Sequence, residues 1–127
     1  MKWLVRAEDS GRDLKDSDIP ALIYAAKGRI YHKSLAYSKA ADNYRKAAFH
    51  NYSNNLHHRF ISNRLKEADC LLMDNDPIKA DVILSEIERE HSNLLSPGLM
   101  KIYYQLKIRL SEELYPDDTY RILEEYL

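Results

Sequence analysis

The sequence is poor in the residues that interrupt helices and in those that cross-link chains. Its 127 residues include three glycines, four prolines and a single cysteine, Cys70. One cysteine excludes an internal disulfide, so we expect a reducing compartment and a cytoplasmic protein. The first ten residues, MKWLVRAEDS, hold only three consecutive apolar residues, too few for a signal peptide or a membrane span. We therefore expect no membrane insertion.

The net charge of −1 hides a strong asymmetry along the chain. Residues 27–66 carry nine Lys or Arg and one acid, whereas residues 67–127 carry fourteen acids and six bases, giving local charges of +8 and −8. Such a chain creates fields of opposite sign over its two halves. The asymmetry favours an acidic protein partner, or a homo-oligomer in which the acidic half of one copy meets the basic half of the next.

Apolar residues recur three and four positions apart, which is the period of a helix. Six segments show the pattern and no segment shows the alternation of a strand, so the sequence predicts an all-α fold with helices over residues 21–34, 38–51, 55–73, 78–91, 98–113 and 117–126. The four prolines fall at helix boundaries, where proline is tolerated. Pro116 follows Pro77, and Pro97 follows Pro20 at about twice that interval, which indicates helical hairpins with a period of roughly 40 residues.

Small and aromatic residues recur at fixed intervals in the first hairpin: Tyr24, Gly28, Tyr31, Ala40, Tyr44 and Ala47. One period later comes a second copy with Ala68, Leu71, Ala80, Leu84 and Ile87, and after another period comes a weaker third copy with Tyr103, Leu106, Leu110, Thr119, Leu123 and Tyr126. The pattern resembles that of the tetratricopeptide repeat family. We expect Gly28 and Ala40 where two helices cross closely, and Tyr31 and Tyr44 in the wedge between hairpins.

The resemblance covers residues 20–127 and implies a right-handed α-α superhelix of three antiparallel hairpins, with repeats at about 20–54, 55–95 and 96–127. Residues 1–19 would form a capping segment in which Trp3, Leu4 and Val5 lie on a short helix. The alternative is a generic helical bundle whose small residues align by chance.

The resemblance also implies a non-catalytic module, such as an adaptor, scaffold or chaperone, that binds a peptide or amphipathic helix on its concave face. The first helix of each hairpin lines that face. Carried over to this sequence, the groove positions are Leu22, Ala25, Arg29, His32, Lys33, Leu65, Lys66, Asp69, Leu72, Met73, Lys101, Tyr104, Gln105, Ile108 and Glu112. Two alternatives stay open: residues 3–5 fold into the groove, or some of these residues are core because the register is wrong by one.

The basic half supports a second hypothesis, a nucleic-acid-associated regulator. Its bases, among them Lys39, Arg45, Lys46, Arg59 and Arg64, interleave with tyrosines, a combination that binds RNA or single strands in other proteins. We favour this function less, because Tyr31 and Tyr44 fit the core of a hairpin better than a stacking platform.

Signals for catalysis are weak. Three scattered glycines make neither a phosphate loop nor a dinucleotide fingerprint. His50, His57 and His58 are near in sequence, but the Ser53–Asn54–Asn55 turn separates them, so we expect no metal site. Cys70 has no flanking motif, and we expect it to be a small core residue. The sequence therefore predicts no enzyme, no cofactor and no metal.

Overall fold

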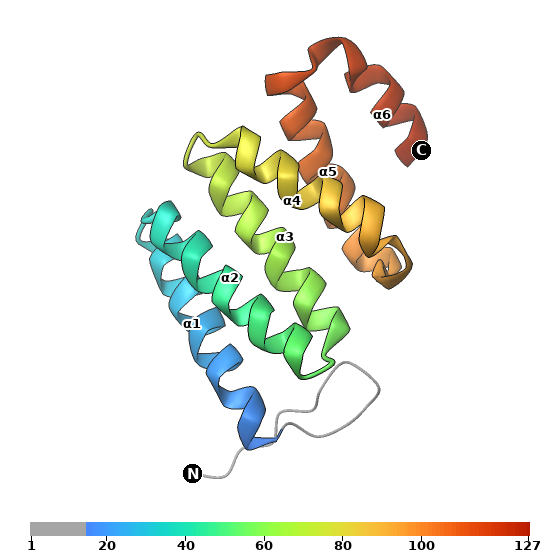
Figure 1. Ribbon diagram of the computed structural model, residues 1–127. Helices are drawn as coiled ribbons and strands as arrows, with labels where there is room; N and C mark the ends of the chain where they lie inside the picture. The colour runs from blue at the N-terminus through green and yellow to red at the C-terminus, as the bar shows by residue number, and fades with distance from the viewer. Residues whose placement is uncertain (1–14) are drawn as a thin grey trace.

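The computed structural model describes residues 15–127, which fold into six α-helices without a strand (Figure 1). The helices are α1 Ile19–Lys33, α2 Tyr37–Ser53, α3 His57–Met73, α4 Pro77–Glu90, α5 Pro97–Leu114 and α6 Thr119–Tyr126. Three short 3-10 turns adjoin them: η1 Asp16–Asp18, η2 Ser92–Leu94 and η3 Pro116–Asp118. The all-α prediction and its six helices are thus confirmed. The helix expected at Trp3–Val5 lies outside the described residues.

The first three interhelical turns share one backbone conformation. Leu35, Asn55 and Asn75 have φ values of 63°, 60° and 59°. In each turn the next amide donates to a carbonyl five residues back, as Ala36 does to Tyr31, and the left-handed residue donates three residues back. These are the two bonds of a Schellman motif, which ends a helix sharply. Because the turns are equal in length and so are α2 and α3, helices α2, α3 and α4 begin at regular intervals, at residues 37, 57 and 77.

The helix starts also follow the capping rules. Asp76 Oδ1 accepts from the Lys79 N–H at 3.3 Å, and Ser96 Oγ accepts from the Leu99 N–H at 3.3 Å. Pro77 and Pro97 each occupy the first helical position, where the missing donor costs nothing. Side-chain caps and prolines therefore begin α4 and α5 where the sequence predicts.

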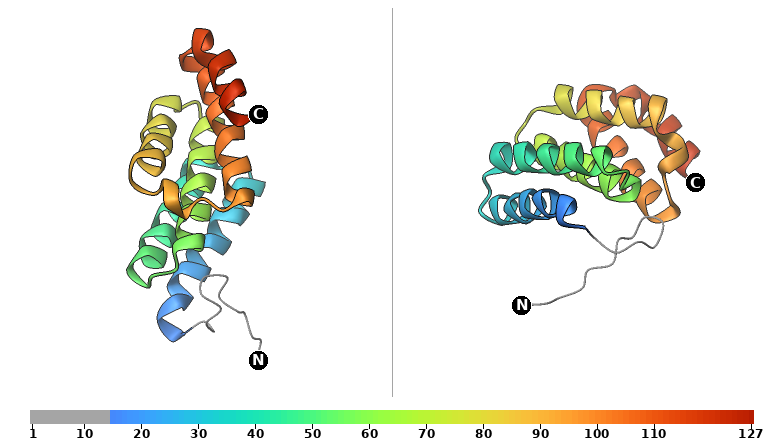
Figure 2. Two further views of the ribbon diagram at one scale, coloured as in Figure 1. Left: turned by 90° about the vertical axis from the view of Figure 1, so that its right-hand side faces the viewer. Right: turned by 60° about the horizontal axis from the view of Figure 1, so that its bottom comes forward.

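The helices form two layers. Each of α1 to α4 packs against its neighbour in sequence, and α5 packs against both α3 and α4. Seen from the side, α2 and α4 lie on one side of the molecule and α1, α3 and α5 on the other (Figure 2, left). The surfaces of α1, α3 and α5 are therefore neighbours, although a helix of the other layer separates successive members in the sequence.

The core runs between the layers. The larger cluster joins α3, α4 and α5 through residues such as Ile61, Leu84 and Leu106. The smaller one joins Tyr44 and two alanines of α2 to Cys70 of α3. Tyr44 packs against Gly28 so closely that a Cβ on the glycine would stand 2.9 Å from three ring atoms. The close crossing expected at Gly28 is therefore present.

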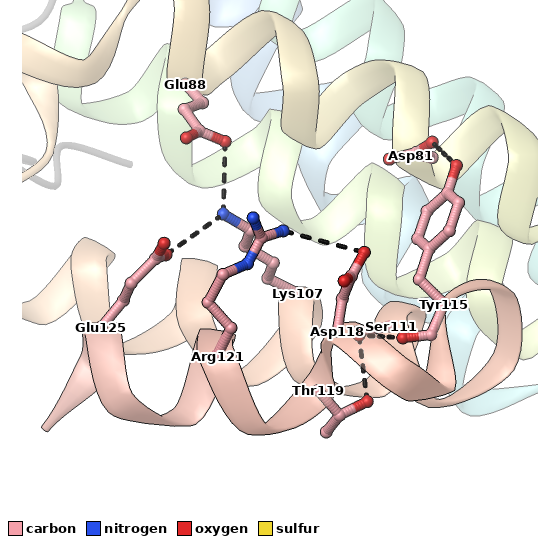
Figure 3. A network of polar contacts seen from close by, with 9 residues as sticks. All are labelled: Asp81, Glu88, Lys107, Ser111, Tyr115, Asp118, Thr119, Arg121 and Glu125. Carbon is pink, nitrogen blue, oxygen red and sulfur yellow. Dashed lines mark hydrogen bonds and ion pairs between the residues drawn. The ribbon is translucent and has the colours of Figure 1, made fainter.

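A 39-residue proline spacing predicts Lys107 at the small position of the third hairpin, whereas the 40-residue step from Gly28 to Ala68 leads to Ile108. Lys107 Nζ lies 3.3 Å from a Glu88 carboxylate oxygen on α4 and 3.8 Å from one of Glu125 on α6 (Figure 3). The Lys107 Nζ also lies over the ring of Tyr103, 5.7 Å from its centroid. Lys107 thus links α5 to α4 and α6 through polar contacts.

Candidate functional site

A cavity of about 200 Å³ opens between α3 and α5, in the layer that the sequence assigns to partner binding. We call it the α3–α5 groove, and its lining is Ser62, Leu65, Lys66, Asp69, Ile102, Gln105, Leu106 and Arg109. Four of these eight, Leu65, Lys66, Asp69 and Gln105, are groove positions expected from the sequence. The lining consists of four pairs related by the hairpin period: each α3 residue is matched by the α5 residue 40 positions later, as Asp69 is by Arg109.

Asp69 connects the three helices of this layer. One carboxylate oxygen lies 2.6 Å from Arg109 Nη1 on α5, and the other lies 3.5 Å from His32 Nε2 on α1. Arg109 also places Nη2 3.5 Å from the Met73 sulfur. These pairs are partly exposed, so each stabilises the fold by only about 0.2–1 kcal/mol. Their main effect is to hold the Arg109 guanidinium at the mouth of the groove.

The groove combines apolar and cationic surface. Ile102 and Met73 are 43% and 45% exposed, and the buried Leu65 and Leu106 form the cavity floor. Lys66 lies with Nζ 5.8 Å from the centroid of the Tyr44 ring. Because Asp69 already pairs with Arg109, a ligand that fits this surface would offer an aliphatic group to the floor and a negative charge to Lys66.

One of the expected groove residues of α3, Leu72, is wrong, and Leu65 is more deeply buried than expected. Leu65 is 1% exposed and Leu72 5% exposed, and both belong to the main core cluster. The cause is the width of the apolar stripe on α3, which contacts α2, α4 and α5 together. Leu65 still forms part of the groove floor, but Leu72 is not available to a partner.

On α5 the expected register is offset by one residue. The sequence gives Lys101, Tyr104, Gln105, Ile108 and Glu112, whereas the lining has Ile102, Gln105, Leu106 and Arg109. Tyr104 instead stacks on Tyr126 of α6, with ring centroids 5.2 Å apart. The error comes from the proline spacing, which places the third copy one position too early relative to the period of the lining. Ile102, Leu106 and Arg109 were missed for this reason, whereas Ser62 of α3 was not among the expected positions.

The expected residues of α1 lie beside the groove rather than in its lining. His32 reaches Asp69, as described, and its ring also meets Tyr37 edge-on at 5.4 Å. Arg29 and Lys33 are exposed and Leu22 is half-buried. Arg29, Asp69 and Arg109 occupy the same position in successive repeats, so charge alternates along this layer.

The expected basic patch faces two larger cavities at the α2/α4 layer. One, of about 460 Å³, is lined by residues that include Lys46, Phe49 and Phe60, and the other, of about 530 Å³, by residues that include Lys79 and Val82. Arg45 and Arg64 line both. Lys39 and Arg59 line neither of these two cavities.

Carboxylates offset several charges of this patch. Arg64 lies 2.7 Å from Glu67 and 2.8 Å from Glu86, which belong to the acidic half of the sequence. Asp42 pairs with Arg45 and, at 3.1 Å, with Lys46, and both hydrogen bonds lower the pKa of its carboxyl group. Arg64 and Arg45 are therefore engaged within the protein, which reduces the positive field that a nucleic acid would require.

Glu67 is the most constrained member of this network. Its side chain is 7% exposed, and burial raises the pKa of its carboxyl group, while Arg64 acts in the opposite direction. Burial dominates because the desolvation of a carboxylate outweighs the single short contact to a guanidinium. The pair therefore sets the geometry of Arg64 without a large gain in stability.

Comparison with known proteins identifies no relative: no family model, curated protein or solved structure matches the chain. Within residues 15–127, none of the helices combines the length and apolar character needed to cross a bilayer. The functional argument therefore depends on the geometry of the grooves.

Proposed function

We propose that this protein is a tetratricopeptide-like, non-catalytic interaction module that binds a peptide or amphipathic helix of a partner protein on its α1/α3/α5 layer. The observation that carries the proposal is the agreement between sequence and geometry. Three residues of α3 carried over from the family resemblance, Leu65, Lys66 and Asp69, line one cavity between α3 and α5, together with Gln105 of α5. A generic bundle gives no reason for groove-lining residues to repeat at the period of the hairpins.

The chemistry of the groove defines the partner segment. An aliphatic side chain would fill the cavity above Leu65 and Leu106, and an acidic residue beside it would meet Lys66. Exposed Ile102 would extend the apolar contact. Apolar contacts would supply most of the affinity, whereas the charges would set orientation.

The test is a selection of peptides from a random display library on the immobilised protein. Selected peptides should combine an acidic residue with Leu, Ile or Met, and their affinity should fall at least tenfold in Ile102→Asp and in Lys66→Glu. Val82→Asp, on the α2/α4 layer, is the matched control and should bind as the wild type does. Equal affinity for the Ile102 variant and the wild type would overturn the proposal.

A salt titration separates the nucleic-acid alternative. Binding of a single-stranded RNA would weaken steeply between low and moderate salt because counterions are released. Binding of a selected peptide should change much less, since the apolar floor of the groove provides most of the contact. Salt-sensitive RNA binding that Arg45→Glu abolishes would favour the alternative function.

A further inference from the structure

Three side chains at the end of α4 bring metal-ligating atoms together outside the α3–α5 groove. Glu86, Glu90 and His91 each offer a ligand atom, and these three atoms lie within 4.8 Å of one another. Glu86 and Glu90 are one helical turn apart and therefore share a face of α4. His91 follows at the position where the helix ends, its N–H donating to the Ile87 carbonyl at 2.9 Å.

The surroundings orient two of these ligands. The Arg64 guanidinium donates to Glu86 Oε2 at 2.8 Å, and ligating carboxylates commonly hold such a second hydrogen bond. The His91 imidazole meets the ring of Phe60 edge-on, with centroids 5.1 Å apart, and lies 6.2 Å from that of Tyr52. Packing against these two rings restricts the rotation of the His91 imidazole, so that binding costs less side-chain entropy.

The electrostatics at this place favour a cation. Two carboxylates one turn apart repel each other, and the carbonyl end of a helix carries a partial negative charge. The Arg64 charge opposes a cation, but Glu67 shares it at 2.7 Å. Arg89, with Nη2 3.6 Å from Glu90 Oε1, also opposes a cation, and its exposed side chain can move away.

We propose that Glu86, Glu90 and His91 bind a divalent transition metal, with Zn²⁺ as the best fit. One imidazole and two carboxylates suit zinc, whereas Mg²⁺ and Ca²⁺ take oxygen ligands alone. Ligand atoms around tetrahedral zinc lie about 3.3 Å apart, given bonds of about 2.0–2.1 Å. The three ligand atoms must therefore come closer together when zinc binds. The exposed Glu90 side chain can move toward the other two by a change of rotamer. The sequence signal for this site is the Glu-x3-Glu-His spacing of residues 86–91.

Calorimetric titration of the chelator-treated full chain with ZnCl₂ tests this site. We expect one zinc per chain, no comparable binding of Mg²⁺, and affinity at least about tenfold weaker in His91→Ala and Glu90→Gln, because removal of groups that merely orient ligands already costs about 10–100-fold. His57→Ala removes an exposed histidine outside the cluster and should bind as the wild type does. Glu90 is exposed, so Glu90→Gln keeps the test valid if His91→Ala fails to fold.

Two results would overturn the site. One is the absence of zinc binding by the folded wild type. The other is binding that Glu90→Gln leaves unchanged, or that His57→Ala weakens as much as His91→Ala does. Because the cluster lies outside the α3–α5 groove, either result leaves the proposed peptide binding unaffected.

Discussion

Gly28 on α1 lies directly over the ring of Tyr44 on α2, and a Cβ at position 28 would stand 2.9 Å from Cε1, Cε2 and Cζ of that ring. Tyr44 is itself 4% exposed and packs beside Cys70 of α3. The missing side chain at Gly28 therefore allows α1 to approach α2 closely, and Tyr44 also packs against α3.

Gly28→Ala should destabilise the fold although alanine is the better helix former. Overpacking against the buried ring costs about 1–3 kcal/mol, which exceeds the gain of about 1 kcal/mol in helix propensity. Gly98→Ala is the matched control, because a Cβ there meets nothing within 4 Å, and it should stabilise by up to about 1 kcal/mol. Urea denaturation followed by circular dichroism measures both. Equal stabilisation by the two substitutions would refute the close crossing.

The three Schellman turns predict a stabilising substitution at Leu35. A leucine at φ 63° carries a steric penalty of about 1–2 kcal/mol that glycine and, in part, asparagine avoid. Because the side chain is 70% exposed, Leu35→Asn should raise the free energy of unfolding by up to about 1 kcal/mol. The reverse change, Asn75→Leu at φ 59°, should lower it. Thermal denaturation of the two variants measures the effect; an unchanged midpoint in both would contradict the shared turn geometry.

The buried carboxyl group of Glu67 should make the free energy of unfolding depend on pH. Burial raises the pKa of its carboxyl group in the folded state, so the folded protein binds more protons than the unfolded chain between the ordinary glutamate pKa and the raised one. The contribution of Glu67 is therefore present at low pH and is lost as the pH rises through that window. Glu67→Gln should gain stability relative to the wild type as the pH rises through that window.

The control for this titration is Glu113→Gln on the exposed surface of α5. Its stability difference from the wild type should stay nearly constant over the same pH range. Unfolding by urea at several pH values supplies both differences. A constant difference for Glu67→Gln as well would mean that the Arg64 contact compensates the burial of the carboxylate fully.

Cys70 should be inert toward thiol reagents in the native protein. The side chain is fully buried, and burial raises the pKa of the thiol to about 12. Since the thiolate is the reactive form, a disulfide reagent at pH 8 should react only after denaturant is added. Rapid stoichiometric reaction of the folded protein would show that the seam between α2 and α3 opens.

Helix positions could be predicted from the sequence because prolines and capping residues mark them. Pro77, Pro97, Asp76 and Ser96 stand where α4 and α5 begin. The groove of α5 could not be placed as well, because the 39-residue proline spacing differs by one from the 40-residue period of the groove lining, which only the fold shows.

Contacts between residues far apart in the chain could also not be predicted from the sequence. The charge asymmetry predicts complementary surfaces, but not that Arg64 meets Glu86 22 residues away within the same chain. Burial of Leu72 likewise depends on the packing of α4 and α5 against α3. Such facts require tertiary geometry, whereas helix existence depends on local pattern alone.

The most direct test of peptide binding is a map of backbone amide shifts in the isotope-labelled protein when a selected peptide is added. The largest changes should cluster on α3 and α5 at Lys66, Asp69, Gln105 and Arg109, with α4 nearly unaffected at Val82. Changes centred on Arg45, Phe49 and Val82 would instead contradict binding in the α3–α5 groove and move the interaction to the opposite layer.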